Sequence, residues 1–585
     1  MVELDEPIKD YNSFFKEAHA KNVTEYFEEL VRESGVSEEE NKSTVAQLRI
    51  YENSLKESSS SRKWWRVGRV LLIVAAISLG AGAFTQQGWY YALLAPAVAA
   101  IVFIFWKINP EVSSLNDQVK ELEKKRDEQA GLAWIQMDPL NRLHTWEAGR
   151  DLFNKTYPTV QFDPYFSNLR LADLQNSYGL SPSFNDGKSI FLSHSGTLKN
   201  NPFVFTRYMQ HWIGSMSYTG SLTIYWTETV RDAQGNWVNV QKSQVLTASV
   251  VKPYPEYAIR TGIIYGHESA PNLSFSRTPS NLSGLDEGVL NTWRKDHAVR
   301  KVERKARKDL KSGKGDLTVM SNREFEALFN ATNRDHEMEF RLLFTPLAQQ
   351  EIVNILNDKS VGYGDNFAFE KQGMVNFVES GHLRDTRIDC DPRMFHNLEL
   401  EEARKFFNDF HNEYFRSLYF CLAPLLSVPL YREARSLPTN NQISQAKQSC
   451  YWEHEAMANF IGENTFKHPE SVTRNIIKTY SNGGGRYTSS VSVTAFGYRG
   501  DPRVDYVPVL GGDGRVHQVP VPWTEYIPVE RSSTLVVGAL KDVEKKVDDA
   551  TSAEIDSEWS KVFSNYGIDK ERIYVHGALA GAVVG

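Results

Sequence analysis

The chain has 585 residues, of which 41% are hydrophobic and 24% charged; this balance is typical of globular domains and excludes a disordered chain or a protein made mainly of membrane helices. Its net charge of −7 argues against general affinity for nucleic acid. Three cysteines are too few for a disulfide framework, which agrees with a reducing compartment.

The first sixty residues predict two helices on the cytosolic side. Apolar residues from Phe14 to Val31 repeat at helical spacing, and Gly35 ends this first helix. A second helix is expected over 38–58, where Val45 and Leu48 take heptad a and d positions.

Two apolar runs follow back to back, at 70–84 and 89–106, joined by Thr85-Gln86-Gln87-Gly88. Neither run contains a charged residue, and as helices they measure roughly 22 and 27 Å against a hydrocarbon core of about 30 Å. They predict a transmembrane hairpin; the alternative is a buried helical hairpin in a soluble protein. The expected interface anchors are Trp64, Trp65, Arg66, Arg69, Trp89, Trp106 and Lys107.

The basic residues around these runs set the expected orientation. Arg62, Lys63, Arg66 and Arg69 precede the first run and Lys107 follows the second, whereas the connecting loop has no Lys or Arg. By the positive-inside rule, both termini lie in the cytoplasm and the hairpin enters the inner membrane from that side. The lipid bilayer is then the first predicted partner.

Residues 108–131 predict a short coiled-coil stalk. Val112, Leu115, Val119 and Leu122 repeat at 3-4-3 spacing among charged residues. Because the hairpin returns the chain to the same side, this helix and 38–58 are expected to pair antiparallel. The alternative is two independent surface helices.

Beyond the stalk the pattern mixes helices and strands. Residues 184–265 are rich in β-formers, and Ser221–Val230 and Trp237–Ser249 alternate apolar and polar residues, which predicts a hairpin. Further hairpins are expected at Gln372-Gly373 and Asp513-Gly514.

Three more segments carry specific expectations. Met338–Phe344 is expected to be a strand, 401–431 a buried helix that Pro424 and Pro429 make too broken to span a membrane, and Leu535–Val547 an amphipathic helix. A capping box at Ser321-Asn322-Arg323-Glu324 starts another helix.

One family resemblance accompanies this layout, over about residues 64–380. A membrane hairpin, a coiled-coil flank and a β-rich region occur together with Phe325-Glu326, Phe329, Asp335, Glu339, Arg341, Leu343 and Thr345-Pro346. The chain resembles an uncharacterised bacterial family of membrane proteins with a transmembrane hairpin and a cytosolic domain of unknown function. The resemblance implies an inner-membrane protein and assigns no activity or catalytic residue.

Motifs that would carry catalysis are weak. Gly187-Lys188-Ser189 lacks the spacing of a phosphate-binding loop and is better explained as a turn. Cys450 and His454 have the i, i+4 spacing of two metal ligands, but no third ligand is evident and chance packing is the preferred explanation. Asp385, Asp389 and Asp391 alternate with arginines, which favours a surface ion-pair loop over a magnesium site. We therefore predict neither a metal nor a cofactor.

A basic segment is the clearest candidate for a binding surface. Ten basic and three acidic residues between 294 and 314 give a local charge of about +7, with Val299, Val302, Ala306 and Leu310 on the opposite seam. The pattern predicts a helix, and a solvated helix docked by that seam is its simplest explanation. The functional hypothesis is contact with anionic lipid headgroups, and nucleic acid is less favoured because no aromatic residues are interleaved. The predicted contact residues are Arg300, Lys301, Arg304, Lys305, Arg307 and Lys308.

Together these patterns predict a membrane-anchored α+β protein with N-terminal helices, a two-helix transmembrane hairpin, a short coiled-coil stalk and a large mixed α+β cytosolic region. The expected segments are 1–60, 64–107, 108–131, a β-rich domain at 132–283, the basic helix at 284–316, and α+β domains at 317–436 and 437–585. The predicted role is binding or scaffolding at the cytoplasmic face, with a cytosolic protein or a second copy as further partner. The alternatives are a membrane-tethered enzyme and an oligomeric membrane assembly packed through small residues at 80–83 and 95–100.

Overall fold

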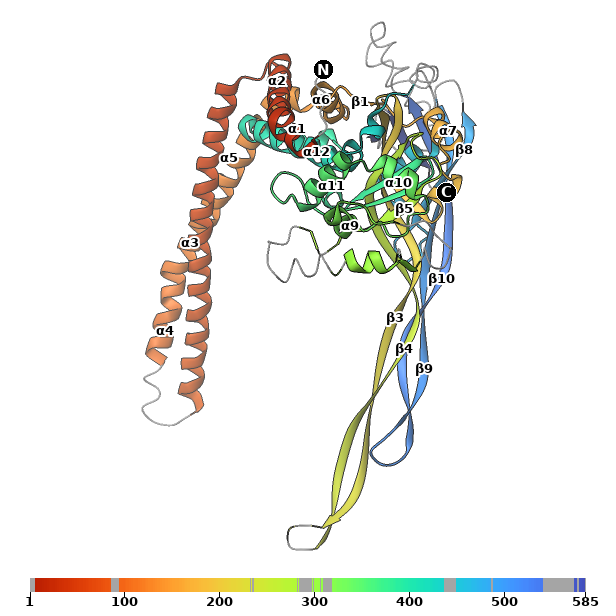
Figure 1. Cartoon of the computed structure of the whole chain (residues 1–585). Coiled ribbons are helices and arrows are strands. Elements are labelled where there is room, and N and C mark those ends of the chain that lie inside the picture. The colour runs from red at the N-terminus through yellow and green to blue at the C-terminus, as the bar shows by residue number, and fades with distance from the viewer. Residues whose placement is uncertain are drawn as a thin grey trace. The chain divides into compact units, whose positions relative to one another are not determined.

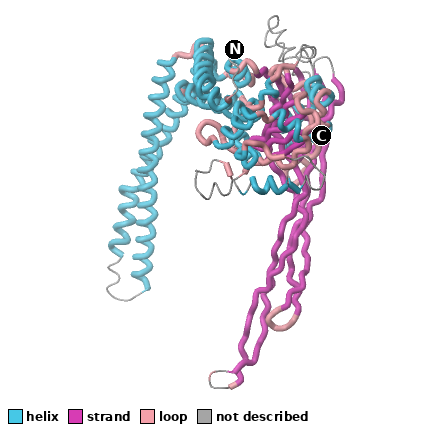
Figure 2. The backbone as a smooth tube through the Cα atoms, viewed as in Figure 1, coloured by secondary structure: helices cyan, strands magenta, loops and turns pink. Residues whose placement is uncertain are grey.

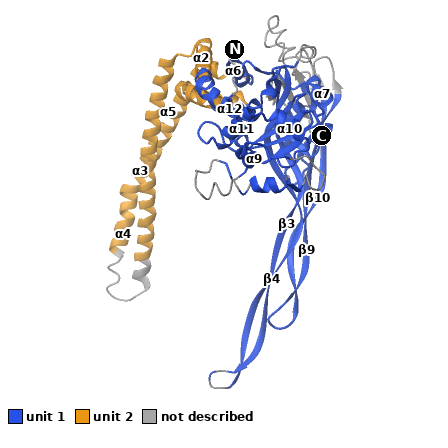
Figure 3. Ribbon diagram, in the orientation of Figure 1, with its two compact units in different colours: residues 1–19, 146–389, 413–585 blue, residues 20–145, 390–412 orange. Residues whose placement is uncertain are grey.

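The computed structural model describes residues 6–85, 94–231, 233, 236–280, 282–283, 297, 299–305, 307–308, 318–435, 449–484, 488–539, 573–575 and 578–583. They form two compact units (Figure 3). The helical unit comprises Ala20–Thr145 and Cys390–Asn412, and the β-rich unit comprises Met1–His19, Trp146–Asp389 and Glu413–Gly585. Helices and antiparallel sheets are both present, so the predicted mixed α+β class is confirmed.

The helical unit contains the predicted N-terminal helices, and the described parts of the two predicted apolar runs are helical; the membrane hairpin itself stays a prediction. Gly35, at φ +66°, takes the left-handed conformation that ends the first of the predicted N-terminal helices. Its elements are α2 (Lys16–Ser34), α3 (Glu38–Thr85), α4 (Leu94–Phe103), the π-helical turn η3 (Ile104–Ile108), α5 (Asn109–Asn141) and the 3-10 turn η6 (Pro392–Phe395).

The long helices α3 and α5 run antiparallel and pack side by side (Figure 1). The side-chain amide of Gln136 donates to Thr44 Oγ1 at 3.1 Å, and Arg66 donates to Asn116 Oδ1 at 2.9 Å. These two contacts fix one register along the pair. The predicted antiparallel pairing is therefore confirmed, while coiled-coil geometry stays a prediction.

Two asparagines hold the later segment of this unit. Asn41 accepts from the backbone N–H of Leu400 and donates to the carbonyl of Leu398, both at 3.0 Å. Asn141 makes the same two-way contact with the backbone of Asn397, both at 3.1 Å. Each asparagine side chain thus takes the place of a backbone hydrogen-bond partner for residues 397–400.

The β-rich unit is built on a seven-stranded antiparallel sheet with strand order β1-β2-β3-β4-β7-β6-β5. Phe166, Ile190, Val204, Ile264 and Trp452 form the centre of its buried core. The turn at Gln372-Gly373 joins two paired strands, as predicted. The strands are β1 (Val160–Phe162), β2 (Lys188–Leu198), β3 (Asn201–Arg231), β4 (Trp237–Gly266), β5 (Ser274–Arg277), β6 (Phe367–Gln372) and β7 (Val375–Ser380).

Helices and short turns surround this sheet. The longest is α12, whose residues up to Asn412 belong to the helical unit and whose later residues belong to the β-rich unit; it confirms the predicted helix near 401–431. They are α1 (Pro7–Asp10), η1 (Tyr11–Phe15), α6 (Ala148–Thr156), α7 (Asn168–Asn176), η4 (Pro182–Asn185), α9 (Arg323–Phe329), α10 (Glu337–Leu343), α11 (Pro346–Asn357), η5 (Gly381–Arg384), α12 (Leu400–Leu426), η7 (Pro429–Arg432), α14 (Tyr451–Ile461) and α15 (Glu463–Phe466).

A second antiparallel sheet has the order β11-β12-β10-β9-β8. Met457 of α14 packs against its buried face beside Ile477, Val493 and Leu535. The strands are β8 (Ile476–Gly484), β9 (Thr488–Leu510), β10 (Val516–Ala539), β11 (Ile573–Val575) and β12 (Ala578–Val583).

Two predicted elements are wrong. Met338–Phe344 belongs to helix α10 and its C-cap, because Phe340, Leu343 and Phe344 are buried at the i, i+3, i+4 spacing of a helix. The predicted helix at Leu535–Val547 begins as strand β10, because Leu535 pairs with Val491 and alternate side chains enter the second sheet's core. Residues 540–547 lie outside the described part of the chain.

Two long β-ribbons, β3–β4 and β9–β10, extend together from the β-rich unit as an arm (Figures 1 and 2). The predicted hairpin is confirmed, and its pairing continues from Arg231 opposite Trp237 down to Phe203 opposite Tyr265. Ile224, Leu246 and Val519 form a small buried core between the ribbons. Gly220 is required there, because a Cβ would overlap the carbonyl of Pro520.

Candidate functional site

The hairpin end of the helical unit exposes an unusual amount of apolar surface. Twelve large apolar side chains on α3 and on α4–η3 point outward and are 41–77% exposed, and no charged residue occurs between Arg69 and Thr85. A contiguous apolar patch of this kind marks a membrane or protein contact. These residues are Val67, Val70, Leu71, Ile73, Val74, Ile77, Val98, Ile101, Val102, Phe103, Phe105 and Trp106.

One described helix meets the length and hydropathy of a membrane span. It covers Ala95–Asn141, and 17% of its most apolar window is buried. A shallow, open apolar depression of about 690 Å³ lies along α4 and η3, lined by Ala95, Val98, Ala99, Val102, Phe103 and Trp106. The second predicted span, on α3, does not meet the same criterion within the described residues. Membrane insertion of the pair therefore stays a prediction.

The predicted interface anchors lie at two different heights on the hairpin. Trp64 and Trp106 are 76% and 77% exposed, whereas Trp65 packs against the buried cluster of Ile104, Ile108 and Val112. Arg66 lies level with Asn116, so Trp106 lies ten residues, or about 15 Å, nearer the hairpin tip. Trp64 and Trp106 therefore lie at different distances from the hairpin tip and do not form a single band of aromatic residues.

The remaining anchors have mixed environments. Arg69 is half-buried and Lys107 is exposed. Trp89 lies outside the described residues. Lys107 falls within the π-helical turn η3, where Pro110 lacks the N–H that would bond the carbonyl of Trp106. The helix thus widens where the apolar segment meets the polar stalk.

The basic segment is helical at 297, 299–305 and 307–308, the part of it that the structure describes. Val299 and Val302 are buried, as the predicted seam requires. Ala306 and Leu310 lie outside the described residues. The six predicted contact residues, Arg300, Lys301, Arg304, Lys305, Arg307 and Lys308, are all exposed. This basic helix therefore presents one charged face.

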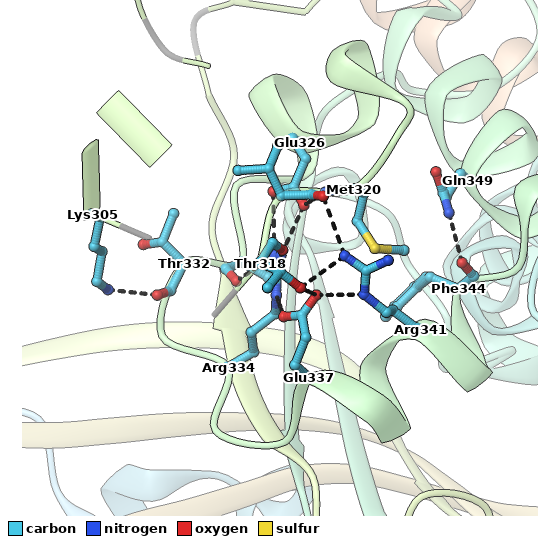
Figure 4. Close-up of polar contacts among 12 residues, drawn as sticks. Lys305, Thr318, Met320, Glu326, Thr332, Arg334, Glu337, Arg341, Phe344 and Gln349 are labelled. Atoms are coloured by element: carbon cyan, nitrogen blue, oxygen red, sulfur yellow. Dashed lines mark hydrogen bonds and ion pairs between the residues drawn. The ribbon is translucent and has the colours of Figure 1, made fainter. Parts of the chain in front are cut away.

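Polar contacts attach the basic helix to its neighbours. Lys305 donates to the carbonyl of Thr332 at 2.5 Å, and Glu303 pairs with Arg323 at 2.6 Å (Figure 4 shows the first contact). Lys305 is thus partly bound to the rest of the chain, whereas among the described residues Arg300, Lys301, Arg304, Arg307 and Lys308 have no ion-pair partner.

A buried ion-pair network lies beside this attachment (Figure 4). Arg334 contacts Glu326 at 2.8 Å and Glu337 at 2.7 Å, and Glu337 also accepts from Arg341 at 2.9 Å. Burial disfavours the charged Arg334, but the bonds to Glu326 and Glu337 outweigh it and raise its pKa. Glu326 also accepts from the backbone N–H of Met320 at 2.8 Å.

A second buried pair fixes the chain before the basic helix. Arg277 contacts Asp365 at 2.6 Å, and their side chains are 0% and 3% exposed. Asp365 also accepts from Ser280 N at 2.8 Å and from the hydroxyl of Ser283 at 2.9 Å. These contacts hold Arg277, Ser280 and Ser283, which precede the basic helix, against the segment just before strand β6.

The weak catalytic candidates do not assemble into a site. Cys450 is the buried N-cap of α14, and burial raises its pKa well above the ordinary value, so the reactive thiolate is disfavoured. Burial lowers the pKa of His454 to about 4, and its Nε2 lies 3.0 Å from Ser449 Oγ. Gly187, at φ +64°, forms a turn before strand β2, as predicted, and no helix follows it.

The aspartate cluster also carries no metal site. Asp391 pairs with Arg393 at 2.7 Å, which is the predicted ion-pair loop. Within the described residues, no group of three His, Cys, Asp or Glu side chains is placed to hold a metal ion, and this includes Asp385 and Asp389.

Sequence reasoning missed two buried carboxylates on α14. Burial raises the pKa values of Glu453 and Glu455 to about 7. Glu453 accepts from Phe166 N at 2.9 Å, while Glu455 accepts from Ile190 N and from Lys478, both at 3.2 Å. Two acids within an otherwise apolar helix were the available signal. Glu455 joins α14 to strand β2 of one sheet and strand β8 of the other, and Glu453 joins it to the segment before α7, which is a structural role.

Comparison with protein families, curated proteins and solved structures gives no match for this chain. The resemblance to an uncharacterised bacterial membrane family accordingly stays a prediction that rests on the residues quoted above.

Proposed function

We propose that the chain is an integral membrane protein anchored by the α3–α4 hairpin, and that it binds or scaffolds at the cytoplasmic face of the membrane. The observation that carries the proposal is the concentration of outward apolar side chains on both arms of the hairpin. Water does not favour such a surface, whereas lipid tails accept it without cost.

The basic helix supports the choice of a binding role at that surface. It offers five exposed basic side chains beyond Lys305, and each such residue near an anionic leaflet contributes about 1 kcal/mol. Binding to headgroups needs no catalytic constellation. This agrees with the burial and structural use of Cys450, His454, Glu453 and Glu455.

Alkaline extraction followed by flotation tests the anchor. A variant with Ile73, Ile77, Val98 and Val102 each changed to Glu should leave the membrane fraction, because each central charge costs about 2.5–3.5 kcal/mol on insertion. The matched control places four Glu on exposed stalk positions, Asn53, Ser60, Ser113 and Gln118, and should float like the wild type. Release of the wild type by alkali would refute the anchor.

A further inference from the structure

The arm leaves one strand edge open. Strand β2 covers β3 only up to the pairing of Lys188 with Gln210, and His211 N still donates to the carbonyl of Gly187 at 3.0 Å. From Trp212 to Arg231, β4 is the only described strand that pairs with β3. The other edge of this stretch therefore has no strand partner among the described residues.

The other strands of the arm carry residues that discourage edge pairing. Proline and inward or edge lysine are the usual guards, because proline has no N–H to donate and lysine must be desolvated. The guards are Lys242, Lys252, Pro253 and Pro255 on β4, Pro502 and Pro508 on β9, and Pro520, Pro522 and Pro528 on β10. Between Trp212 and Arg231, β3 has neither proline nor lysine.

The open stretch is also uncharged and apolar enough to pair. No charged residue occurs from Trp212 to Thr227. Ile213, Met216 and Tyr225 are 54%, 43% and 69% exposed. Ile213 and Tyr225 share one face of the strand with a row of small hydroxyl side chains, whereas Met216 lies on the other face. The hydroxyl side chains of this row are all exposed: Ser215, Ser217, Thr219, Ser221, Thr223, Thr227 and Thr229.

We propose that this edge is a self-association site, at which a second copy of the chain adds its own β3 antiparallel to the first. The two arms would then share one sheet in the order β4-β3-β3-β4. Two identical strands related by a two-fold axis pair antiparallel, so one edge serves both copies. Ser and Thr form favourable cross-strand pairs, and the absence of charge means that no like charges meet.

A second copy fits this edge better than a charged peptide. A peptide that relied on ion pairs would find no complementary charge between Trp212 and Thr227. The β3 stretch itself is matched in length, polarity and hydroxyl spacing to its own copy. Main-chain hydrogen bonds would supply the affinity, as in other strand-addition interfaces.

Oxidative cross-linking of single cysteine variants tests the symmetry. The full chain, purified in mild detergent, would carry Cys at Ser217, Thr219, Ser221 or Thr223, while the buried native cysteines stay in place. Disulfide-linked dimers should peak at one position, the one nearest the two-fold axis. The matched control positions, Thr247 and Ser249 on the guarded strand β4, should not cross-link. Absence of any dimer from β3 would overturn the proposal.

A variant with added positive charges tests the same contact through the molar mass of the protein in solution. The triple variant Ser217→Lys, Ser221→Lys and Thr223→Lys should weaken dimerisation roughly tenfold or more in light scattering, because like charges face each other across the pair. The control triple, Ser243→Lys, Thr247→Lys and Ser249→Lys, adds the same charge to exposed positions of β4 and should remain dimeric. A monomeric wild type, or equal dimerisation of both triples, would overturn the proposal.

Discussion

Arg334 and Glu326 form an ion pair at 2.8 Å in which only 1% of either side chain is exposed. The pair ties α9 to the loop before α10, and the neighbouring Thr332 carbonyl accepts from Lys305 of the basic helix. Because both charges are buried, each depends on the other for stabilisation. The presentation of the basic face therefore depends on a network that is hidden from solvent.

Removing one member of that pair should be costly. Arg334→Met leaves Glu326 buried with fewer partners, and a loss of about 3–5 kcal/mol is expected for a broken buried pair. Hydrogen exchange over 318–357 should accelerate. The control Arg323→Gln removes an exposed pair with Glu303 and should change little, since surface pairs contribute about 0–1 kcal/mol. Equal exchange in both variants would contradict the network's role.

Gly220 should be intolerant of a larger side chain. Gly220→Val overlaps the carbonyl of Pro520, and overpacking of this kind costs about 1–3 kcal/mol. Exchange should therefore rise in both ribbons near 216–224 and 517–523. Thr219→Val, on the exposed face of the same strand, is the control and should leave the arm intact. A silent Gly220→Val variant would mean that the ribbons do not pack at this point.

The buried carboxyl of Glu453 should contribute a fall in stability as pH rises from about 4.5 to about 7, whereas buried His454, whose pKa is lowered to about 4, contributes in the opposite direction. Burial raises the pKa of Glu453 from its ordinary 4.5 to about 7, so the folded chain keeps a proton that the unfolded chain releases earlier. Over that window the carboxyl alone would remove of the order of 3 kcal/mol. In urea unfolding at several pH values, the free energy of unfolding of Glu453→Gln, taken relative to that of the wild type, should rise across this window. If the free energy of unfolding of the variant depended on pH as that of the wild type does, Glu453 would not contribute to the dependence.

The basic helix should be sensitive to lipid charge. The full chain in nanodiscs that contain phosphatidylserine should protect 299–308 from exchange more than in purely zwitterionic discs. Protection should weaken between 0.1 and 1 M salt, as the Debye length falls from about 10 to about 3 Å. Changing Arg300, Lys301, Arg304, Arg307 and Lys308 to Gln should abolish the difference while keeping helix propensity.

A matched charge variant separates this contact from general attraction. Gln at Arg474, Arg499, Arg503, Lys242 and Lys252 removes the same charge from the sheets and the arm and should leave the lipid dependence intact. Equal protection from exchange with anionic and zwitterionic lipid would mean that the segment is a solvated helix that does not contact the headgroups.

Periodic segments were predictable because a local pattern determines them. The β3–β4 hairpin follows from alternation over Ser221–Val230, and the α3–α5 pair follows from repeated Val and Leu at heptad spacing. Phe340, Leu343 and Phe344 show where the pattern was misread, since their helical spacing was available in the sequence.

The remaining features depend on contacts between distant segments. Nothing local indicates that β4 pairs with β7 more than a hundred residues later, or that Gly220 meets Pro520. The burial of Glu453 and the partners of Arg334 likewise arise from packing. The exposed face of the basic helix was predictable, because it requires only spacing and charge.

The most direct test of the membrane anchor is cysteine labelling in intact cells with a membrane-impermeant maleimide. Separate variants would carry Cys at Ser60 and at Gln87, with the buried native cysteines retained. The account predicts that the Gln87 variant is labelled from outside and that the Ser60 variant is labelled only after permeabilisation. Labelling of Ser60 from outside, or protection of Gln87 until the membrane is opened, would contradict it.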